Sequence, residues 1–155
     1  RAVGPNAVLP RIIAASRLPA ETKILDYGSG PKALHSAQLR ELGYHVVAWD
    51  IGANFDPTIH DSQALNYQYD VVMASNVLNV LPDLNAVTNV VQELLNCLAP
   101  GGQLLVNFPA EPRYNSITGE ELIELLSDFS PSVWVINHNS STPVILATAA
   151  HSFYE

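Results

Sequence analysis

Two acidic residues follow two short apolar stretches in the first third of the chain, with a glycine-rich turn between them. Asp26 closes residues 23–26 and leads into Gly28-Ser29-Gly30, whereas Asp50 closes residues 45–50. In a parallel sheet covered by helices, ligands bind beyond the carboxyl ends of the strands, so side chains that end neighbouring strands meet in one crevice. Glycine lacks a Cβ and lets a ligand approach the backbone, and the helix that follows offers unpaired N–H groups. The pattern predicts a nucleotide-sized site in which both carboxylates face one glycine-lined hollow.

The two carboxylates favour different parts of a ligand. Asp50 follows Asp26 at close to the ~20-residue offset at which an acidic side chain meets ribose hydroxyls in nucleotide-binding sheets. Asp26 stands directly before the glycine turn, where a dinucleotide site would place a pyrophosphate. A carboxylate would repel that group, so the pair favours a positively charged nucleoside.

The rest of the sequence alternates the strand and helix patterns that must position these groups. Continuous apolar runs predict strands buried on both faces, apolar residues at helical spacing predict helices, and Thr118 with Glu121 has the form of a capping box. The predicted strands span residues 23–26, 45–50, 58–60, 69–75, 103–108, 132–137 and 143–149, and the predicted helices span residues 7–17, 33–42, 83–98 and a segment that begins at residue 118. Because residues 138–142 are too few for a crossover helix, we expect the last two strands to be antiparallel.

The composition is that of one folded domain. The 155 residues are 48% hydrophobic and 14% charged, which is ample material for a core. We expect an α/β fold, with a three-layer, doubly wound, mostly parallel sheet of about seven strands and a C-terminal antiparallel hairpin. Residues 1–20 are expected to form a helical cover and residues 21–149 the core of a single domain that spans residues 1–155.

Charge and hydropathy limit the classes of partner that the protein is expected to bind. Seven Lys and Arg against fifteen Asp and Glu give a formal charge of −8, which repels a phosphate backbone. Direct nucleic-acid binding is therefore disfavoured, although a partner subunit would be able to supply it. Apolar runs stay short of the ~20 residues that span a bilayer, and the start lacks a signal-peptide pattern, so we expect a cytoplasmic protein without a membrane partner. Cys97 is expected to pack in a helix, and the Cys and His spacing indicates no metal.

Several motifs occur in a fixed order along the chain. They are Asp26-x-Gly28-x-Gly30, the strand-ending Asp50, Asp61-Ser62, Tyr69-Asp70-Val71-Val72, Leu98-Ala99-Pro100-Gly101-Gly102 and the terminal hairpin. Each is weak alone, but their order and spacing together are specific. Across residues 23–149 the chain resembles the class I S-adenosylmethionine-dependent methyltransferases, which have a Rossmann-like fold.

The resemblance implies S-adenosylmethionine as the cofactor and S-adenosylhomocysteine as its product. By this resemblance Asp26 orders the methionine part, directly or through water, Asp50 holds the ribose, and Ile51 lies against the adenine. Asp61 would accept from the adenine amino group, and Ser62 or Gln63 would offer a backbone N–H to the ring. The cofactor residues that the resemblance implies are Asp26, Tyr27, Gly28, Ser29, Gly30, Asp50, Ile51, Asp61, Ser62, Ser75 and Asn76.

The acceptor side offers fewer candidates. Asn76 and Asn79 follow a predicted strand, where they would hydrogen-bond the cofactor or the acceptor or else cap a helix. Residues 109–117 form the sizeable loop that would serve as an acceptor lid, and its Arg113 and Tyr114 are expected to touch an anionic or planar substrate. The sequence assigns no catalytic base.

Residues near the glycine turn depart from the family pattern. Pro31-Lys32 stands where many members have a small residue and glycine. Lys32 would point to solvent, reach the cofactor carboxylate, or fill the pocket of an inactive enzyme. His35 is expected on the solvent-facing side of its helix.

Together the residues favour transfer of the cofactor's methyl group to an unidentified acceptor, with a small molecule or a protein favoured over nucleic acid. A catalytically inactive binding or scaffold domain of the same fold is the first alternative, supported by Lys32. A nicotinamide-binding oxidoreductase on a related sheet is the second, and Asp26 and the terminal hairpin count against it.

Overall fold

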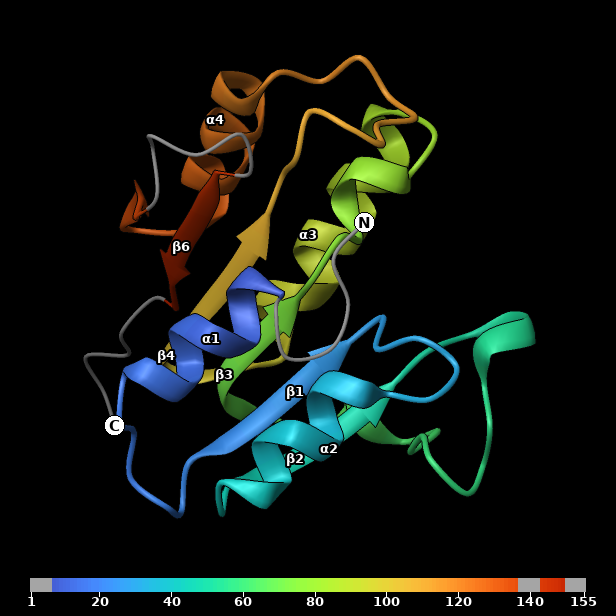
Figure 1. Cartoon of the computed structure of the whole chain (residues 1–155). Helices are drawn as coiled ribbons and strands as arrows, with labels where there is room; N and C mark the ends of the chain where they lie inside the picture. Colours follow the sequence, from blue (N-terminus) through green and yellow to red (C-terminus); the bar gives the residue numbers. More distant parts are fainter. Residues whose placement is uncertain (1–6, 137–142, 150–155) are drawn as a thin grey trace.

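The computed structural model describes residues 7–136 and 143–149, which form a central sheet with helices on both faces (Figure 1). The predicted turn at residues 138–142 lies outside the described residues. The strands are β1 (Lys23–Tyr27), β2 (His45–Trp49), β3 (Tyr69–Ala74), β4 (Leu98–Asn107), β5 (Val133–Val135) and β6 (Val144–Thr148). The helices are α1 (Val8–Ala15), α2 (Leu34–Glu41), α3 (Leu84–Asn96) and α4 (Gly119–Phe129).

The strand order in the sheet is β2-β1-β3-β4-β6-β5. The first four strands are parallel, whereas β6 runs antiparallel to both β4 and β5. The predicted mostly parallel sheet with a C-terminal antiparallel hairpin is therefore confirmed. Parallel order brings the ends of β1, β2 and β3 to the same edge, where ligands bind in this architecture.

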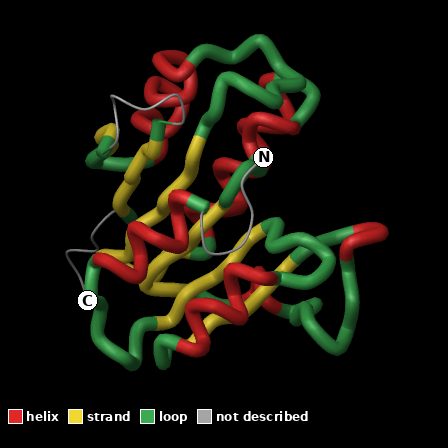
Figure 2. The backbone as a smooth tube through the Cα atoms, in the orientation of Figure 1, coloured by secondary structure: helices red, strands yellow, loops and turns green. Residues whose placement is uncertain are grey.

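Helices cover both faces of the sheet, and Figure 2 shows those of one face in front of the yellow strands. On one face, Leu9 and Ile13 of α1 and Leu39 of α2 pack on Ile24 and Met73. On the other face α3 and α4 cover the sheet through buried Val and Leu side chains, namely Val87, Val91, Leu94, Leu122 and Leu126. The capping box expected at the start of α4 is present, with Thr118 and Glu121 bonded reciprocally.

The predicted strand at residues 58–60 is wrong, and the described residues form a six-stranded sheet where about seven strands were expected. The Asp56 carboxylate accepts from the Thr58 N–H and hydroxyl at 2.8 and 2.7 Å, and the Asp56 carbonyl accepts from the N–H groups of Ile59 and His60 at 2.9 and 2.7 Å. These bonds close a turn, so the backbone cannot extend. Besides this turn, the connection between β2 and β3 contains two short 3₁₀ turns, at Gly52–Asn54 and Ala64–Asn66.

The missing strand leaves β2 at the edge of the sheet, where exposed backbone groups are open to pairing with other chains. Local groups cover its outward carbonyls instead. The Arg40 guanidinium donates to the Val46 carbonyl at 2.9 and 3.1 Å, and the Asp61 N–H donates to the Ala48 carbonyl at 3.0 Å. Two outward carbonyls of this edge are therefore already paired.

Among the residues that the structure describes, none of the helices combines the length and the apolar character needed to cross a membrane.

Candidate functional site

The glycine turn connects β1 to α2 and is fastened to the end of β2. Gly28 and Gly30 have φ values of +67° and +83°, which side chains with a Cβ rarely adopt. The N–H groups of Gly28 and Ser29 both donate to the Trp49 carbonyl, at 2.8 and 3.1 Å. The turn therefore follows a set path at the carboxyl edge of the sheet.

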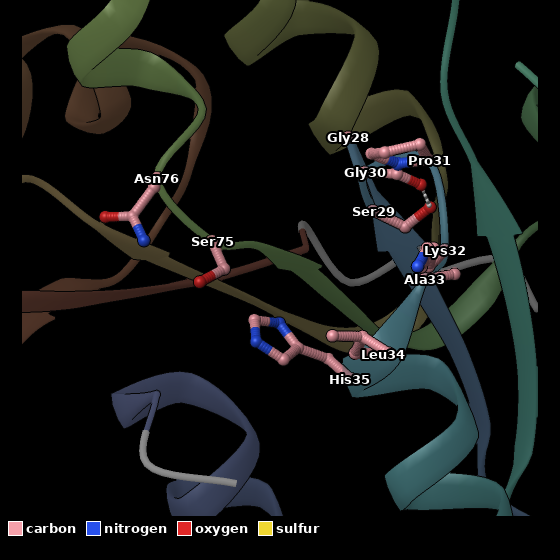
Figure 3. A pocket seen from close by; sticks show the side chains of 10 residues that line it. All are labelled: Gly28, Ser29, Gly30, Pro31, Lys32, Ala33, Leu34, His35, Ser75 and Asn76. Carbon is pink, nitrogen blue, oxygen red and sulfur yellow. Dashed lines mark hydrogen bonds between the residues drawn. The ribbon is translucent and has the colours of Figure 1, made fainter. Parts of the chain in front are cut away.

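Two adjoining pockets meet at this turn. The first has a volume of about 190 Å³ and lies between the turn and the residues after β3, with Ser75 and Asn76 across the hollow from the turn (Figure 3). The second has a volume of about 230 Å³ and extends past the end of β2, over Trp49, Asp50, Ile51, Asn54, Val77, Val80, Leu81 and Val90. Gly28, Gly30, Ser75 and Asn76 line both pockets, so the two form one elongated hollow. Its combined size suits a small-molecule site of roughly 300–1,000 Å³.

Asp50 lies in the second pocket, as its position at the end of β2 predicted. One carboxylate oxygen accepts from the Gly30 N–H at 2.8 Å, and the other accepts from the Ile51 N–H at 2.8 Å. Asp50 thereby ties the glycine turn to the end of β2. A carboxylate offers about four lone-pair sites, so capacity remains for hydroxyl groups of a ligand.

Asp26 does not reach the hollow, and the expected meeting of two carboxylates there is wrong. The Asp26 side chain is 1% exposed and lines neither of these pockets, and its carboxylate accepts from the Ser36 hydroxyl at 2.7 Å. The strand continues to Tyr27, so Asp26 pairs with Ala48 and Met73 inside the sheet and faces α2. Burial raises the pKa of this carboxyl to about 7, against the lowering effects of the Ser36 bond and Arg40.

Three other predicted cofactor residues surround the turn. Tyr27 lines the second pocket and packs against Trp49, with ring centroids 4.6 Å apart and planes tilted by 35°. Its hydroxyl donates a hydrogen bond to Glu93. Burial, with the Glu93 bond, raises the pKa of the Tyr27 hydroxyl. Ser29 lines the first pocket, and Ile51, which is 63% exposed, lies at the second. An exposed Ile51 beside Asp50 leaves an apolar surface for a flat ring.

Asp61 and Ser62 are not brought into either of these pockets. Both are exposed, and the Asp61 carboxylate accepts from the Gln63 N–H at 2.8 Å. Because residues 58–60 form no strand, Asp61 follows a turn beside the sheet edge and does not end a strand. The adenine-binding role of this pair stays a prediction.

Ser75 and Asn76 lie where the two pockets join. The Asn76 N–H donates to Asn107 Oδ1 at 2.6 Å, and Asn107 Nδ2 donates to Asn76 Oδ1 at 2.9 Å. This reciprocal pair holds Asn76 at a φ of +57°. The buried Ser75 hydroxyl oxygen has no hydrogen-bond partner among the described residues. Sequence reasoning missed Asn107, although a polar residue that ends an apolar strand was a visible signal.

His35 and Lys32, next to the glycine turn, both line the first pocket. His35 lines the first pocket at 9% exposure, so its predicted solvent-facing position is wrong. Lys32 is exposed and lines the same pocket without filling it. Of the three alternatives for Lys32, obstruction of the pocket is therefore excluded.

The candidate acceptor lid is fastened to the protein. Arg113 bonds to the loop itself, and its contact with a substrate stays a prediction. The Arg113 guanidinium donates to the carbonyls of Pro109, Ile117 and Phe108 at 3.2, 3.0 and 3.1 Å, and its carbon lies 4.0 Å from the Phe108 ring centroid. Such a side chain is committed to the loop itself.

Asn79 also holds this loop, because its side-chain Nδ2 donates to the Pro112 carbonyl at 2.7 Å and its backbone carbonyl accepts from the Tyr114 N–H at 2.8 Å. Asn79 is fully buried and lines neither pocket of the hollow. Tyr114, 68% exposed, remains a candidate for contact with an acceptor.

Arg113→Lys is expected to lower the free energy of unfolding by about 1–3 kcal/mol, because an ammonium cannot bridge three carbonyls. Calorimetric affinity for S-adenosylhomocysteine should stay within about twofold, since Arg113 lies outside the hollow. Urea denaturation measures the first effect. The exposed Arg11→Lys serves as the control, and a loss of affinity without a loss of stability would contradict the structural role.

Comparison with known proteins agrees with this arrangement. A sequence profile described as a methyltransferase domain matches residues 5–137. No curated protein is significantly similar in sequence.

Three solved structures share the fold. Magnesium protoporphyrin IX methyltransferase from Synechocystis PCC 6803, with bound SAM, is 18% identical with a TM-score of 0.67, over 92% of this chain and 76% of that one. A TehB-like SAM-dependent methyltransferase from Corynebacterium glutamicum is 18% identical with a TM-score of 0.68, over 91% and 86%. The T. thermophilus 16S rRNA N2 G1207 methyltransferase is 16% identical with a TM-score of 0.64, over 96% of this chain but only 44% of that protein. This chain therefore has the Rossmann-like class I fold and belongs to the methyltransferase-domain family.

Proposed function

We propose that this protein binds S-adenosylmethionine in the elongated hollow and transfers its methyl group to a small molecule or a protein. The observation that carries the proposal is the hollow at the carboxyl edge of the sheet, where Asp50 fixes the glycine turn through the 2.8 Å bond to Gly30. Solved methyltransferases of this fold hold SAM or SAH, which supports the choice of ligand.

The two pockets divide the cofactor between them. The nucleoside fits the second pocket, where Asp50 has lone pairs left for ribose hydroxyls and apolar Ile51, Val77 and Leu81 line the wall. The methionine part fits the first pocket, where the Ser75 hydroxyl lacks a partner in the described part of the chain. A buried hydroxyl without a hydrogen bond is costly, and a ligand group would satisfy it.

The cofactor supplies an electrophilic methyl carbon, so the chain's own residues need only bind and orient the reactants. Holding acceptor and methyl in line contributes about 7–11 kcal/mol of barrier reduction, and a dedicated base is not required. The turn and Asp50 fix one reactant, and exposed Tyr114 is the remaining candidate for the other.

The acceptor class follows from charge. Relatives of this fold are named for acceptors as different as a porphyrin and ribosomal RNA, so the fold does not choose between them. A formal charge of −8 disfavours a phosphate backbone. We therefore place a small molecule or a protein ahead of nucleic acid.

Asp50→Ala is expected to weaken binding of S-adenosylhomocysteine by about tenfold or more, because a hydrogen bond to a charged group contributes roughly 1.5–3 kcal/mol. Titration calorimetry measures this. Asp70→Ala is the matched control, since Asp70 also accepts a backbone N–H, from Lys23 at 2.9 Å, but lies at the opposite end of the sheet. Equal affinity in both variants would refute the placement of the ribose.

Transfer itself is tested with radiolabelled S-adenosylmethionine in fractionated extract. Label in the protein or metabolite fraction supports the proposal, whereas label in nucleic acid overturns the acceptor class. Binding without transfer to any fraction would favour the inactive binding domain. Failure of the wild type to bind S-adenosylhomocysteine at millimolar concentration would overturn the proposal as a whole.

A further inference from the structure

Gly30 is held through both its N–H and its carbonyl. A histidine outside the turn bonds to this carbonyl, which also accepts from the Ala33 N–H at 3.3 Å and the Ser29 hydroxyl at 3.5 Å. The Gly30 N–H donates to Asp50, and the Gly30 carbonyl is 2.8 Å from Nε2 of His60. His60 is 4% exposed and comes from the connection between β2 and β3. A buried polar side chain far along the chain thus meets the centre of the glycine turn.

The partners of His60 fix which ring nitrogen carries the proton. The Asp56 N–H donates to His60 Nδ1 at 2.9 Å, so Nδ1 is an acceptor and is unprotonated. In a neutral imidazole the other nitrogen then bears the hydrogen, and Nε2 donates to the Gly30 carbonyl. The ring also stacks on Phe55, with centroids 5.9 Å apart and planes 29° apart. Its orientation is therefore set before any ligand arrives.

The turn at residues 56–60, found where a strand was predicted, also positions His60. Bonds from Thr58, Ile59 and His60 to Asp56 close residues 56–60 into a compact turn. That turn places the Asp56 N–H against Nδ1 of His60 and the His60 ring against the glycine turn. An extended strand at residues 58–60 would lack these bonds.

We infer that His60 is a positioning residue that preorganises the glycine turn for the cofactor. The inference rests on the proposed function, because the turn is where that cofactor would bind. Glycine has the largest backbone freedom of any residue, and Gly30, with φ of +83°, meets no heavy atom within 4 Å of an ideal Cβ position. Bonds to its N–H and to its carbonyl order the turn in advance, which spares part of the entropy lost on binding.

Three substitutions of His60 distinguish the effect of the bond to Gly30 from the effect of the other contacts of the ring. Glutamine at this position places an amide N–H donor near Nε2, asparagine places an acceptor near Nδ1, and leucine removes both while it remains apolar. His60→Leu and His60→Asn should therefore accelerate hydrogen exchange in the turn of the ligand-free protein. They should also weaken S-adenosylhomocysteine binding by about five- to tenfold, the loss expected for one hydrogen bond. His60→Gln should restore both quantities to near wild-type values.

Exchange is read by mass spectrometry on peptides that contain residues 27–33, and affinity by calorimetry. His45→Leu, on the exposed start of β2, controls for general effects of replacing a histidine. Unchanged exchange in His60→Leu overturns the inference, and so does a His60→Gln variant that behaves like His60→Leu. If exchange changes in the variants as expected but the wild type binds no S-adenosylhomocysteine, the positioning role stands and the proposed function is refuted.

One further measurement needs no variant. Two-bond ¹H–¹⁵N correlations of the wild-type imidazole should show a protonated Nε2 and an unprotonated Nδ1. The opposite tautomer would exclude donation to Gly30 and overturn the inference even if a substituted protein fails to fold.

Discussion

Gly28→Ala is expected to lower the affinity for S-adenosylhomocysteine by at least about 100-fold, a loss of about 3 kcal/mol. Gly28 has a φ of +67°, where an L-residue costs about 1–2 kcal/mol, and an added Cβ would lie 2.7 Å from Val77 Cγ2. Val77 lines the second pocket, so relief of the contact must move either the turn or the pocket wall. Titration calorimetry measures the affinity, and thermal unfolding measures the accompanying loss of stability.

The chain offers a matched control for the backbone strain. Gly43 has a φ of +98° and no heavy atom within 4 Å of an ideal Cβ, and it lies after α2, outside both pockets. Gly43→Ala should therefore lose stability but keep its affinity. Adding Val77→Ala to Gly28→Ala removes the close contact and should recover part of the affinity. Normal affinity in Gly28→Ala would show that the ligand does not depend on the turn.

The fold was largely predictable because its signals are local. Buried parallel strands appear as continuous apolar runs, such as Tyr69–Ala74, and the capping box at Thr118 marks the start of α4. The polar stretch before residue 143 is short, which forces the reversed direction of β6. These features depend on neighbouring residues and not on distant contacts.

The errors in the fold arise where a turn competes with an extended pattern. Residues 58–60 contain a β-branched pair, but Asp56 and Pro57 precede them, and the Asp56 carboxylate closes a turn. In β4 the strand begins at Leu98 and includes Pro100, because pairing of Leu98 with Tyr69 extends the sheet before a register shift. Long-range pairing of this kind has no signature in the local sequence.

The site was predictable in its position and less so in its contacts. The end of β2 placed Asp50 in the hollow, whereas Asp26, inside β1, faces α2 and bonds to Ser36. Arg113 has a side chain suited to an anionic ligand, but the carbonyls of its own loop engage it. His60 was missed since its partner Gly30 is 30 residues away, and no local pattern reports such a bond.

The free energy of unfolding is expected to fall as the pH rises from about 4 to about 7, with Asp26 as a principal cause. Burial raises the pKa of Asp26 to about 7 in the folded protein, whereas the unfolded chain has a pKa near 3.9. Between these values the folded state binds more protons than the unfolded state, so stability decreases with pH and levels off above about 7. The full penalty is about 4 kcal/mol at pH 8.

Asp26→Asn isolates this contribution. The amide oxygen still accepts from the Ser36 hydroxyl, but the side chain does not ionise. The variant should match the wild type near pH 4 and be more stable at pH 8, by about 4 kcal/mol at most, as urea denaturation would show. The exposed Asp128→Asn is the control and should follow the wild-type curve. Parallel curves for Asp26→Asn and the wild type would contradict a buried, proton-binding Asp26.

Cofactor binding provides a second measurement of the ionisation of Asp26. If the positive charge of a bound S-adenosylmethionine acts on Asp26 across the turn, it favours the ionised form and lowers the pKa of Asp26. Binding near pH 6.5 would then release protons, which calorimetry detects as a heat that depends on the buffer. Asp26→Asn should abolish this release. Equal proton release in the two proteins would confine Asp26 to its bond with Ser36, which holds α2 against β1, and would leave Asp50 as the carboxylate that meets the cofactor.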